Sequence, residues 1–319
     1  MQTSGWIEAM IYVWVIAALN LTYAAGIALG VHPTAFLLEA FFASAVCLLA
    51  IAGPGPAPHR VLFIPQTWAY GACTILCEIF YYLMMAYVQP ADGSIFVRLN
   101  IPVSIALGWL FLSRSVGRLR FAGALFIIGA VAVTGWWFPA THALGFAAAT
   151  VATALTMAGR NFFAEFHPWN RAAKTVLEKM RVVGLVVLVT SIAGIAVTAA
   201  LAQFSSLGML PATPALPTLA QMVHGPTVLL ALLLGCGIIT AMQYLMFSAV
   251  VKITSENFFA MMVFTPFATL LLQEVMGGLG LPGVKPGGWY ILPFLCLLLV
   301  GNLLIIWPVR PEVVRRVVR

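Results

Sequence analysis

An acidic and a basic side chain lie inside two neighbouring apolar runs of the sequence. Glu78 is near the middle of 66–88, and Arg98 is about five residues into 93–113. About eleven residues on either side place Glu78 ~16 Å from each end of its run. Charged groups at such depth are costly in hydrocarbon and usually face a cavity or a partner. We interpret Glu78 as a substrate counter-charge, a proton carrier, or both. The alternative is a structural carboxylate paired with a hydroxyl or with Arg98.

Glu39 and Arg98 enter the membrane to a similar depth from the same side. Glu39 is about six residues, or ~9 Å, inside the run 33–53. Opposite charges at one depth predict either an ion pair that closes this end of a helix bundle or contacts with a substrate, and a gate would combine the two. Arg98 has a third option, which is to extend its guanidinium to the interface.

Several uncharged polar side chains also fall in or near apolar runs at mid-depth. Taken singly, such groups join helices by hydrogen bonds, and taken together they are able to line one cavity. With the charged residues, the predicted substrate-binding or coupling set is Glu78, Glu39, Arg98, Tyr82, Tyr81, Asn20, Asn100, Gln243 and Tyr244. Arg160 and Glu256 lie near the ends of their runs, so we interpret them as interfacial.

Motifs of soluble catalysis are missing from the sequence. It has no Gly-Lys-Ser/Thr phosphate loop, no His-Glu-x-x-His and no nucleophile elbow. Cys73 and Cys77 share a helical face, but no further Cys or His completes a metal set. We therefore expect no enzyme activity, no cofactor and no metal.

The composition is that of a membrane protein. Of 319 residues, 62% are hydrophobic and 8% are charged, whereas soluble domains carry roughly 25% charged residues. The mean hydropathy is +1.03. The net charge of +7 does not indicate nucleic acid, because the basic residues fall in short loops between apolar runs.

Apolar runs of about 20 residues, the length that crosses a bilayer, occur ten times. They are 7–30, 33–53, 66–88, 93–113, 119–138, 143–164, 181–203, 226–250, 255–276 and 288–307. In lipid every backbone group must be satisfied within the segment, and these runs lack barrel-type alternation, so the prediction is an all-α membrane protein. The uncharged stretch 204–225 is expected to be an extended loop with a short interfacial helix.

Basic residues alternate in a way that fixes the orientation. One set of loops carries 13 Lys and Arg and the opposite set carries Lys285 alone, which places both termini in the cytoplasm. The N-terminus has no basic segment before its apolar run, so we expect a retained first span, in a membrane that is most simply a bacterial inner membrane.

Ten spans divide into two halves of five that insert with opposite orientation, as in transporters built from inverted repeats. The predicted halves are 1–140 and 141–319, the second ending in a basic cytoplasmic tail. Tyr82-Leu83-Met84 in the first half is similar to Tyr244-Leu245-Met246 in the second.

Three motifs resemble the EamA-type members of the drug/metabolite transporter superfamily. A span begins at His32-Pro33, another carries Arg98-Leu99-Asn100-Ile101-Pro102 before spaced glycines, and a third ends Leu272-Gln273-Glu274. The sequence departs from the family where Glu39 stands in place of a frequent Arg and where Leu-Ser-Arg replaces the first Leu-Gly-Glu. The resemblance implies ten helices, inverted five-helix repeats and transport of small metabolites.

We therefore expect a secondary transporter, either an exporter or an exchanger, of a small organic metabolite. The Glu39 departure and the aromatic rings near Glu78, which are able to hold a cation, favour a cationic or amino-acid-like substrate. Expected partners are this substrate, protons as coupling ion and the lipid bilayer, in a monomer or homodimer without nucleic acid. The alternatives are a membrane-embedded enzyme or lipid-handling protein, and a non-transporting membrane subunit.

Overall fold

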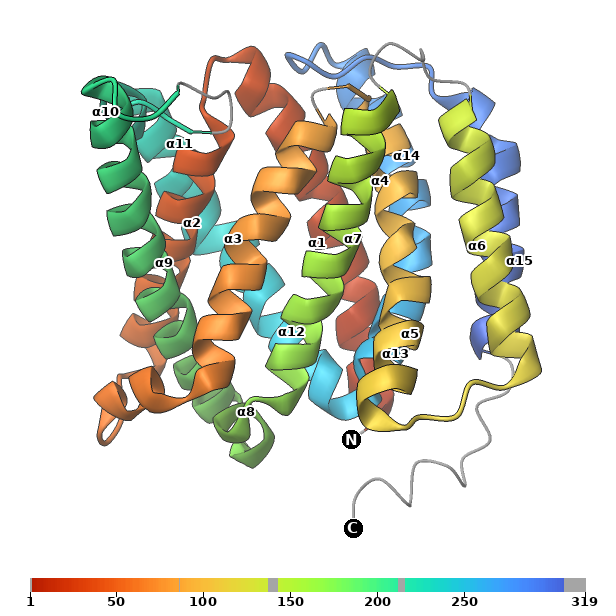
Figure 1. Cartoon of the computed structure of the whole chain (residues 1–319), viewed down its shortest axis with the longest axis horizontal. Coiled ribbons are helices and arrows are strands. Elements are labelled where there is room, and N and C mark those ends of the chain that lie inside the picture. Colours follow the sequence, from red (N-terminus) through yellow and green to blue (C-terminus); the bar gives the residue numbers. More distant parts are fainter. Residues whose placement is uncertain (1, 86, 137–142, 212–215, 307–319) are drawn as a thin grey trace.

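The computed structural model describes residues 2–85, 87–136, 143–211 and 216–306. All regular structure within these ranges is helical, as predicted. The helices of the first part of the chain are α1 (Gln2–Ala28), α2 (Pro33–Ala52), η1 (Pro58–Phe63), α3 (Pro65–Met85), α4 (Pro90–Phe96), η2 (Val97–Leu99), α5 (Asn100–Leu112) and α6 (Arg118–Trp136). They run side by side in Figure 1.

The remaining described helices continue the same bundle. They are α7 (Ala143–Phe166), α8 (Pro168–Ala172), α9 (Val176–Ser206), α10 (Leu219–Met222), α11 (Gly225–Leu234), η4 (Gly235–Ile239), α12 (Thr240–Ile253), α13 (Ser255–Met261), η5 (Met262–Phe264), α14 (Thr265–Gly278), η6 (Trp289–Ile291) and α15 (Leu292–Ile306). The stretch predicted as an extended loop over 204–225 holds the end of α9 and the short helix α10.

Seven helical stretches in the described part are long and apolar enough to cross a bilayer. They are Thr3–Ala28, Thr34–Ala52, Pro90–Phe111, Arg118–Trp136, Val176–Ser206, Gly225–Ile253 and Ser255–Gly278. The chain is therefore an integral membrane protein of the all-α class. Helices α3 and α7 are also long, at 21 and 24 residues, but they are not in this set. They carry Glu78 and Arg160, and they pack on each other.

Two spans are broken at matching places. A seven-residue helix, a three-residue 3-10 turn and a longer helix follow one another in α4–η2–α5 and again in α13–η5–α14. Proline explains both breaks, because its ring clashes with the carbonyl four residues earlier and it donates no backbone hydrogen bond. Pro102 acts in this way on the carbonyl of Arg98, and Pro266 acts on that of Met262.

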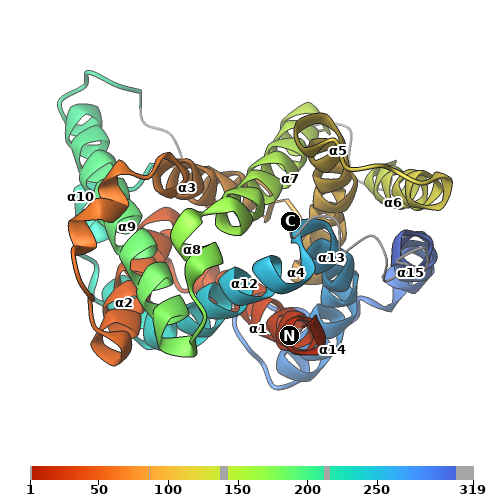
Figure 2. The ribbon, with the colours of Figure 1, turned by 90° about the horizontal axis from the view of Figure 1, so that it is seen from below.

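Neighbours in the bundle are far apart in the sequence. In the view along the helices, α3 lies beside α7, α2 beside α9, and α6 beside α15 at the opposite edge (Figure 2). Helices α6 and α15 meet through backbone, because a Cβ added to Gly123 would strike the carbonyl oxygen of Gly301, and one added to Gly301 would lie 2.9 Å from that of Gly123. Small residues permit such close helix contacts in lipid.

Positive charge gathers on one side of the bundle, here named the N-terminal side because the N-terminus lies there (Figure 1). The turns that leave α2, α5, α7 and α12 all lie on this side, and these turns and the adjoining helix ends hold the described basic residues of the larger predicted set. Lys285, of the opposite set, lies in the connection between α14 and η6 on the other side. The four arginines from 310 onward lie outside the described residues.

Candidate functional site

Glu78 forms a buried ion pair with Arg160 between α3 and α7. Arg160 Nη1 lies 3.3 Å from Glu78 Oε1, with 2% and 11% of the two side chains exposed. The Tyr23 hydroxyl, on α1, donates to Glu78 Oε2 at 3.1 Å. Both carboxylate oxygens therefore have partners. The structure pairs Glu78 with a different arginine from the one that the sequence suggested.

A second polar chain runs from α3 through α1 to α14. The Tyr81 hydroxyl donates to Asn20 Oδ1 at 2.7 Å, and Asn20 Nδ2 donates to Thr269 Oγ1 at 3.3 Å. The rings of Tyr81 and Tyr23 meet edge to face with centroids 6.0 Å apart. This ring contact joins the hydrogen bonds of Tyr81, Asn20 and Thr269 to the Glu78–Arg160 pair.

A third contact links α3 to α12. The Tyr70 hydroxyl donates to Gln243 Oε1 at 2.5 Å. Gln243 Nε2 and Arg160 Nε are both buried and have no hydrogen-bond partner. We refer to Asn20, Tyr23, Tyr70, Glu78, Tyr81, Arg160 and Gln243 as the central polar cluster. Such clusters in a membrane mark functional sites more often than not.

Arg98 occupies the break between α4 and α5 and is 4% exposed. Its Nε donates to the Ser94 carbonyl at 3.0 Å and its Nη1 donates to the Met262 carbonyl at 2.5 Å. It interacts electrostatically with the hydroxyls of Tyr12 and Tyr81. No carboxylate in the described part of the chain forms an ion pair with it.

The predicted pairing of Glu39 with Arg98 does not occur. Glu39 lies on α2, half-buried, and its Oε2 has no hydrogen-bond partner. Asn100 donates to the Met157 sulfur at 2.9 Å. Tyr244 packs partly buried against the apolar core. The side chain of Tyr82 lies outside the described residues. Of the predicted set, the structure therefore links Glu78, Tyr81 and Asn20 through Tyr23, and it bonds Gln243 to Tyr70, about two turns before Glu78 on α3.

Arg160 is not at the interface, contrary to the sequence-based interpretation, whereas Glu256 lies at the start of α13 on the N-terminal side, as interpreted, but is buried within the bundle. Arg160 is 2% exposed and Glu256 is 7% exposed. A residue's distance from a helix end sets its depth, but the direction of its side chain depends on packing. Arg160 points to α3, where Glu78 neutralises it. The one signal available was that an arginine and a glutamate both occur inside spans, each in need of a partner.

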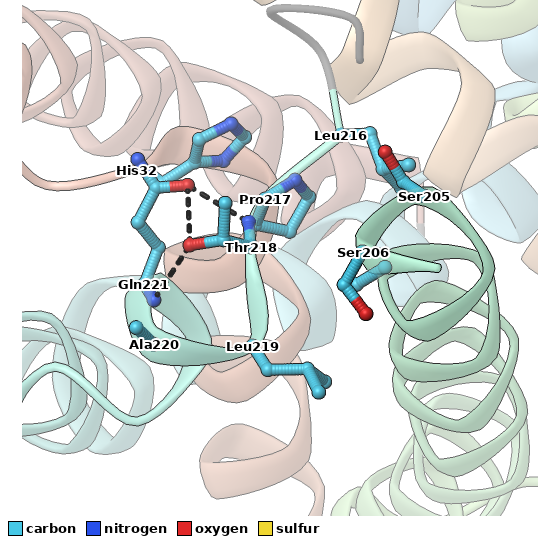
Figure 3. A pocket seen from close by; sticks show the side chains of 10 residues that line it. His32, Ser205, Ser206, Leu216, Pro217, Thr218, Leu219, Ala220 and Gln221 are labelled. Carbon is cyan, nitrogen blue, oxygen red and sulfur yellow. Dashed lines mark hydrogen bonds between the residues drawn. The ribbon is translucent and has the colours of Figure 1, made fainter. Parts of the chain in front are cut away.

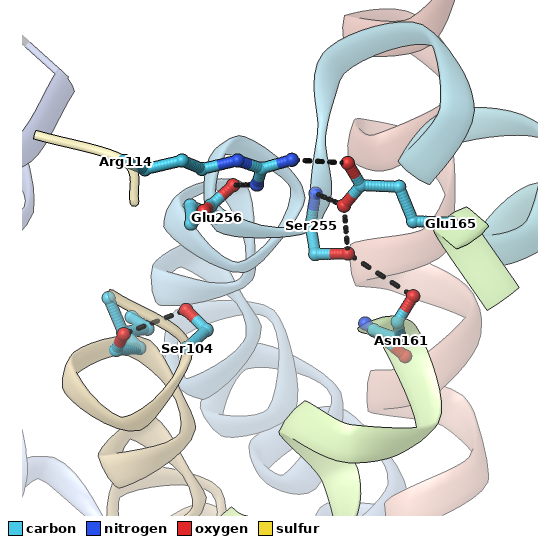
Figure 4. A network of polar contacts seen from close by, with 7 residues as sticks. Ser104, Arg114, Asn161, Glu165, Ser255 and Glu256 are labelled. Atoms are coloured by element: carbon cyan, nitrogen blue, oxygen red, sulfur yellow. Dashed lines mark hydrogen bonds and ion pairs between the residues drawn. The ribbon is translucent and has the colours of Figure 1, made fainter. Parts of the chain in front are cut away.

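A polar network ties helices together at the N-terminal side (Figure 4). Arg114, just after α5, bonds Glu256 through Nη1 and Glu165 through Nη2, the second at 2.7 Å. Glu165 Oε2 accepts from the Ser255 backbone N–H at 2.8 Å and from its hydroxyl at 2.6 Å. The network therefore joins α5, α7 and α13. Gly108 makes room for it, because a Cβ there would strike the Glu256 carboxylate.

The opposite side of the bundle has ties of its own. The Ala91 backbone N–H donates to Gln273 Oε1 at 3.0 Å, which links α4 to α14. The Tyr290 hydroxyl donates to the Asp92 carboxylate, with 2.8 Å to Oδ2, which links η6 to α4. Polar contacts therefore join helices of the two parts of the chain at both ends.

A surface pocket of about 600 Å³ lies between the end of α9 and α10 (Figure 3). Its polar groups include Thr218 and Gln221, which cap α10 by bonding each other's backbone N–H groups. Thr218 and Gln221 are thus already used in capping α10, and no charged side chain lines the pocket. The candidate site is therefore the central polar cluster. No group of three or more metal-ligating side chains occurs among the described residues.

No family model matches the chain, and no curated protein matches it. Among solved structures, 19 chains match. One of them, described only as "Crystal structure of protein", covers 96% of this chain and 97% of its own length, with a TM-score of 0.56 and 17% identity. At this identity the likeness shows a shared fold.

Proposed function

We propose that the chain is a secondary transporter, an exporter or exchanger, of a small organic metabolite. It works by alternating access between two inverted five-helix halves, 1–140 and 141–319, in the manner of the EamA-type drug/metabolite transporters that its motifs resemble. The observation that carries the proposal is the buried Glu78–Arg160 pair, which joins a helix of each half and lies beside unpaired donors.

The broken helices support the division into halves. Each boundary of α13–η5–α14 lies 165 residues after its counterpart in α4–η2–α5, except at the C-terminal end. Transporters with inverted repeats place their sites beside such discontinuous helices, because the breaks free backbone groups in the membrane interior. Arg98 uses one of these freed carbonyls.

The helix neighbours support it as well. If the two halves are equivalent, α3 corresponds to α12 and α7 corresponds to α1. The contact of α3 with α7 should then have a counterpart between α12 and α1, and both contacts exist. The contact of α5 with α7 becomes that of α14 with α1, and both exist too. The pairs α2–α9 and α6–α15 are each their own counterpart. This is the pattern expected for a two-fold axis that relates the halves.

Ties at both ends of the bundle favour an occluded conformation. To admit substrate from the N-terminal side, the network of Arg114, Glu165 and Glu256 must open. To admit it from the other side, the contacts of α4 with Gln273 and Tyr290 must open. The alternating rupture of these two sets gives the physical steps of transport.

The surroundings of the transporter follow from the charge pattern. We propose that the N-terminal side is cytoplasmic, because it carries the larger set of basic residues, and that the membrane is a bacterial inner membrane. Protons are the proposed coupling ion, with Glu78 as the group that binds them.

Proteoliposomes with a pH-sensitive dye inside test this proposal. A panel of small organic acids, amines and amino acids is added outside, and the internal pH is followed. At least one compound class is expected to move protons through the wild type and not through Glu78→Gln. Glu8→Gln, which alters a carboxylate paired with Lys252 at the N-terminal side, serves as the control. Equal proton movement in Glu78→Gln and the wild type would refute the role of Glu78.

A further inference from the structure

We infer that the central polar cluster binds an anionic group of the substrate, of the carboxylate class, between Arg160 and Gln243. The inference rests on the proposed function and names the chemistry of its substrate. It departs from the positively charged substrate that the sequence favoured. That expectation depended on Glu78 without a cationic partner, and the ion pair with Arg160 removes its basis.

The charges at the centre leave a positive excess. Glu78 and Arg160 neutralise each other, whereas Arg98 is buried with only carbonyl partners and hydroxyls around it. Ion pairs in the described part of the chain use Glu8, Glu78, Glu165 and Glu256, and none of them involves Arg98. A buried cation without a counter-ion attracts an anion.

The hydrogen-bond donors point to the same ligand. Arg160 Nη1 is held by Glu78, and Arg160 Nε is buried without a partner. Gln243 Oε1 is held by the Tyr70 hydroxyl, and Gln243 Nε2 is likewise buried without a partner. Buried donors are nearly always paired in native proteins, and an arginine edge suits a carboxylate. Tyr70, the partner of Gln243, and Glu78, the partner of Arg160, lie on the same helix α3, about two turns apart.

The acceptors of the cluster are already in use. Glu78 accepts from Arg160 and Tyr23, Asn20 accepts from Tyr81, and Gln243 accepts from Tyr70. The buried amide oxygens without a partner among the described residues are those of Gln89, Asn100, Asn161 and Asn302, and they are uncharged. An ammonium group would thus meet no free carboxylate in the cluster and would add to the positive excess.

Thermal unfolding of the purified protein in detergent tests the inference without a need for transport. The probes are succinate, lactate and benzoate, compared with putrescine and choline at equal ionic strength and pH. We expect at least one carboxylate to raise the unfolding temperature of the wild type and the two amines to leave it unchanged. Gln243→Glu keeps the acceptor for Tyr70 and replaces the free donor, so it is expected to weaken carboxylate binding about tenfold or more.

Two further variants keep the result interpretable. Gln221→Glu makes the same chemical change in the cap of α10, and carboxylates should stabilise it as much as the wild type. If Gln243→Glu does not fold, Gln243→Met removes the donor without adding charge. The inference is overturned if amines stabilise the wild type and carboxylates do not. It is also overturned if every carboxylate changes the unfolding temperature of the wild type and of the Gln243 variant by the same amount. Carboxylate binding without movement into proteoliposomes would instead overturn the transport proposal alone.

Discussion

The guanidinium of Arg98 donates to the carbonyl oxygen of Met262 at 2.5 Å, across 164 residues of sequence. Arg98 lies in the break of one span, and Met262 begins the break of another. Pro266 prevents the Met262 carbonyl from completing a regular helical bond. The Met262 carbonyl instead accepts from the Thr265 backbone N–H and from the Arg98 side chain of the other broken helix.

Replacement of Arg98 by Met should therefore loosen both breaks. It removes the hydrogen bonds from the guanidinium to the Ser94 and Met262 carbonyls, and a hydrogen bond to a charged group contributes about 1.5–3 kcal/mol. Thermal unfolding in detergent should show a lower midpoint for Arg98→Met and an intermediate one for Arg98→Lys, which keeps a single donor group. An unchanged midpoint in Arg98→Met would mean that these bonds do not stabilise the fold.

The Glu78–Arg160 pair should show energetic coupling in a double-mutant cycle. Glu78→Gln or Arg160→Gln leaves one buried charge unpaired, which costs roughly 3–5 kcal/mol. The double variant removes both charges, so its loss should fall short of the sum of the single losses by about 1–3 kcal/mol. Stability is measured by unfolding in detergent for all four proteins. Strict additivity would exclude a direct interaction.

Removal of Arg114 should open the bundle from the N-terminal side. Arg114→Ala leaves Glu165 and Glu256 as two carboxylates without their shared cation. In a variant that lacks the natural cysteines, a cysteine at buried Ser104, near this network (Figure 4), should react faster with a membrane-impermeant maleimide. We expect an increase of about tenfold, which corresponds to about 1.4 kcal/mol in the opening equilibrium.

Arg118→Ala is the matched control for this experiment, because Arg118 is an exposed arginine at the start of α6 on the same side. It should leave the labelling rate unchanged. Equal rates in Arg114→Ala and Arg118→Ala would show that the network does not hold this end closed.

Acid should destabilise the protein through His167, in the turn between α7 and α8. Burial lowers the pKa of His167 to about 4, whereas an unfolded histidine titrates near 6.5. The unfolded chain therefore binds the proton first, so stability present above pH 6.5 is lost as the pH falls toward 4, by at most about 3 kcal/mol.

The check is the pH dependence of unfolding in the wild type and His167→Gln. The Gln side chain still offers a partner to the Thr67 hydroxyl, which lies 3.0 Å from His167 Nε2. The variant should show a shallower loss of stability between pH 6.5 and 4. Parallel curves for the two proteins would assign the acid sensitivity to other groups.

The sequence predicts the helices well and their partners poorly. The run 33–53 became α2 at Pro33–Ala52, and 143–164 became α7 at Ala143–Phe166. Length and apolarity suffice for this, because a bilayer demands a minimum run of apolar residues. The breaks at η2 and η5 were missed, although Pro102 and Pro266 were visible, since many membrane helices tolerate proline without a break.

In the candidate site too, the sequence predicts the position of a residue along its helix but not the residue that it contacts. Glu78 was recognised because depth follows from counting residues along a span. Its partner Arg160 was misplaced, and Glu165 was not singled out, because their roles depend on which helices pack together. That choice is made by tertiary contacts, such as those of α3 with α7, which no local pattern records.

The glycine contact between α6 and α15 bears on how the protein moves. Gly123 and Gly301 bring the backbones of α6 and α15 so close that a Cβ on either glycine would meet the backbone carbonyl of the other. This edge of the bundle thus resists separation, while the ties elsewhere consist of side chains that exchange partners readily. We expect the contact of α6 with α15 to act as the hinge of the motion, so that displacements increase toward α2 and α9 at the opposite edge of the bundle.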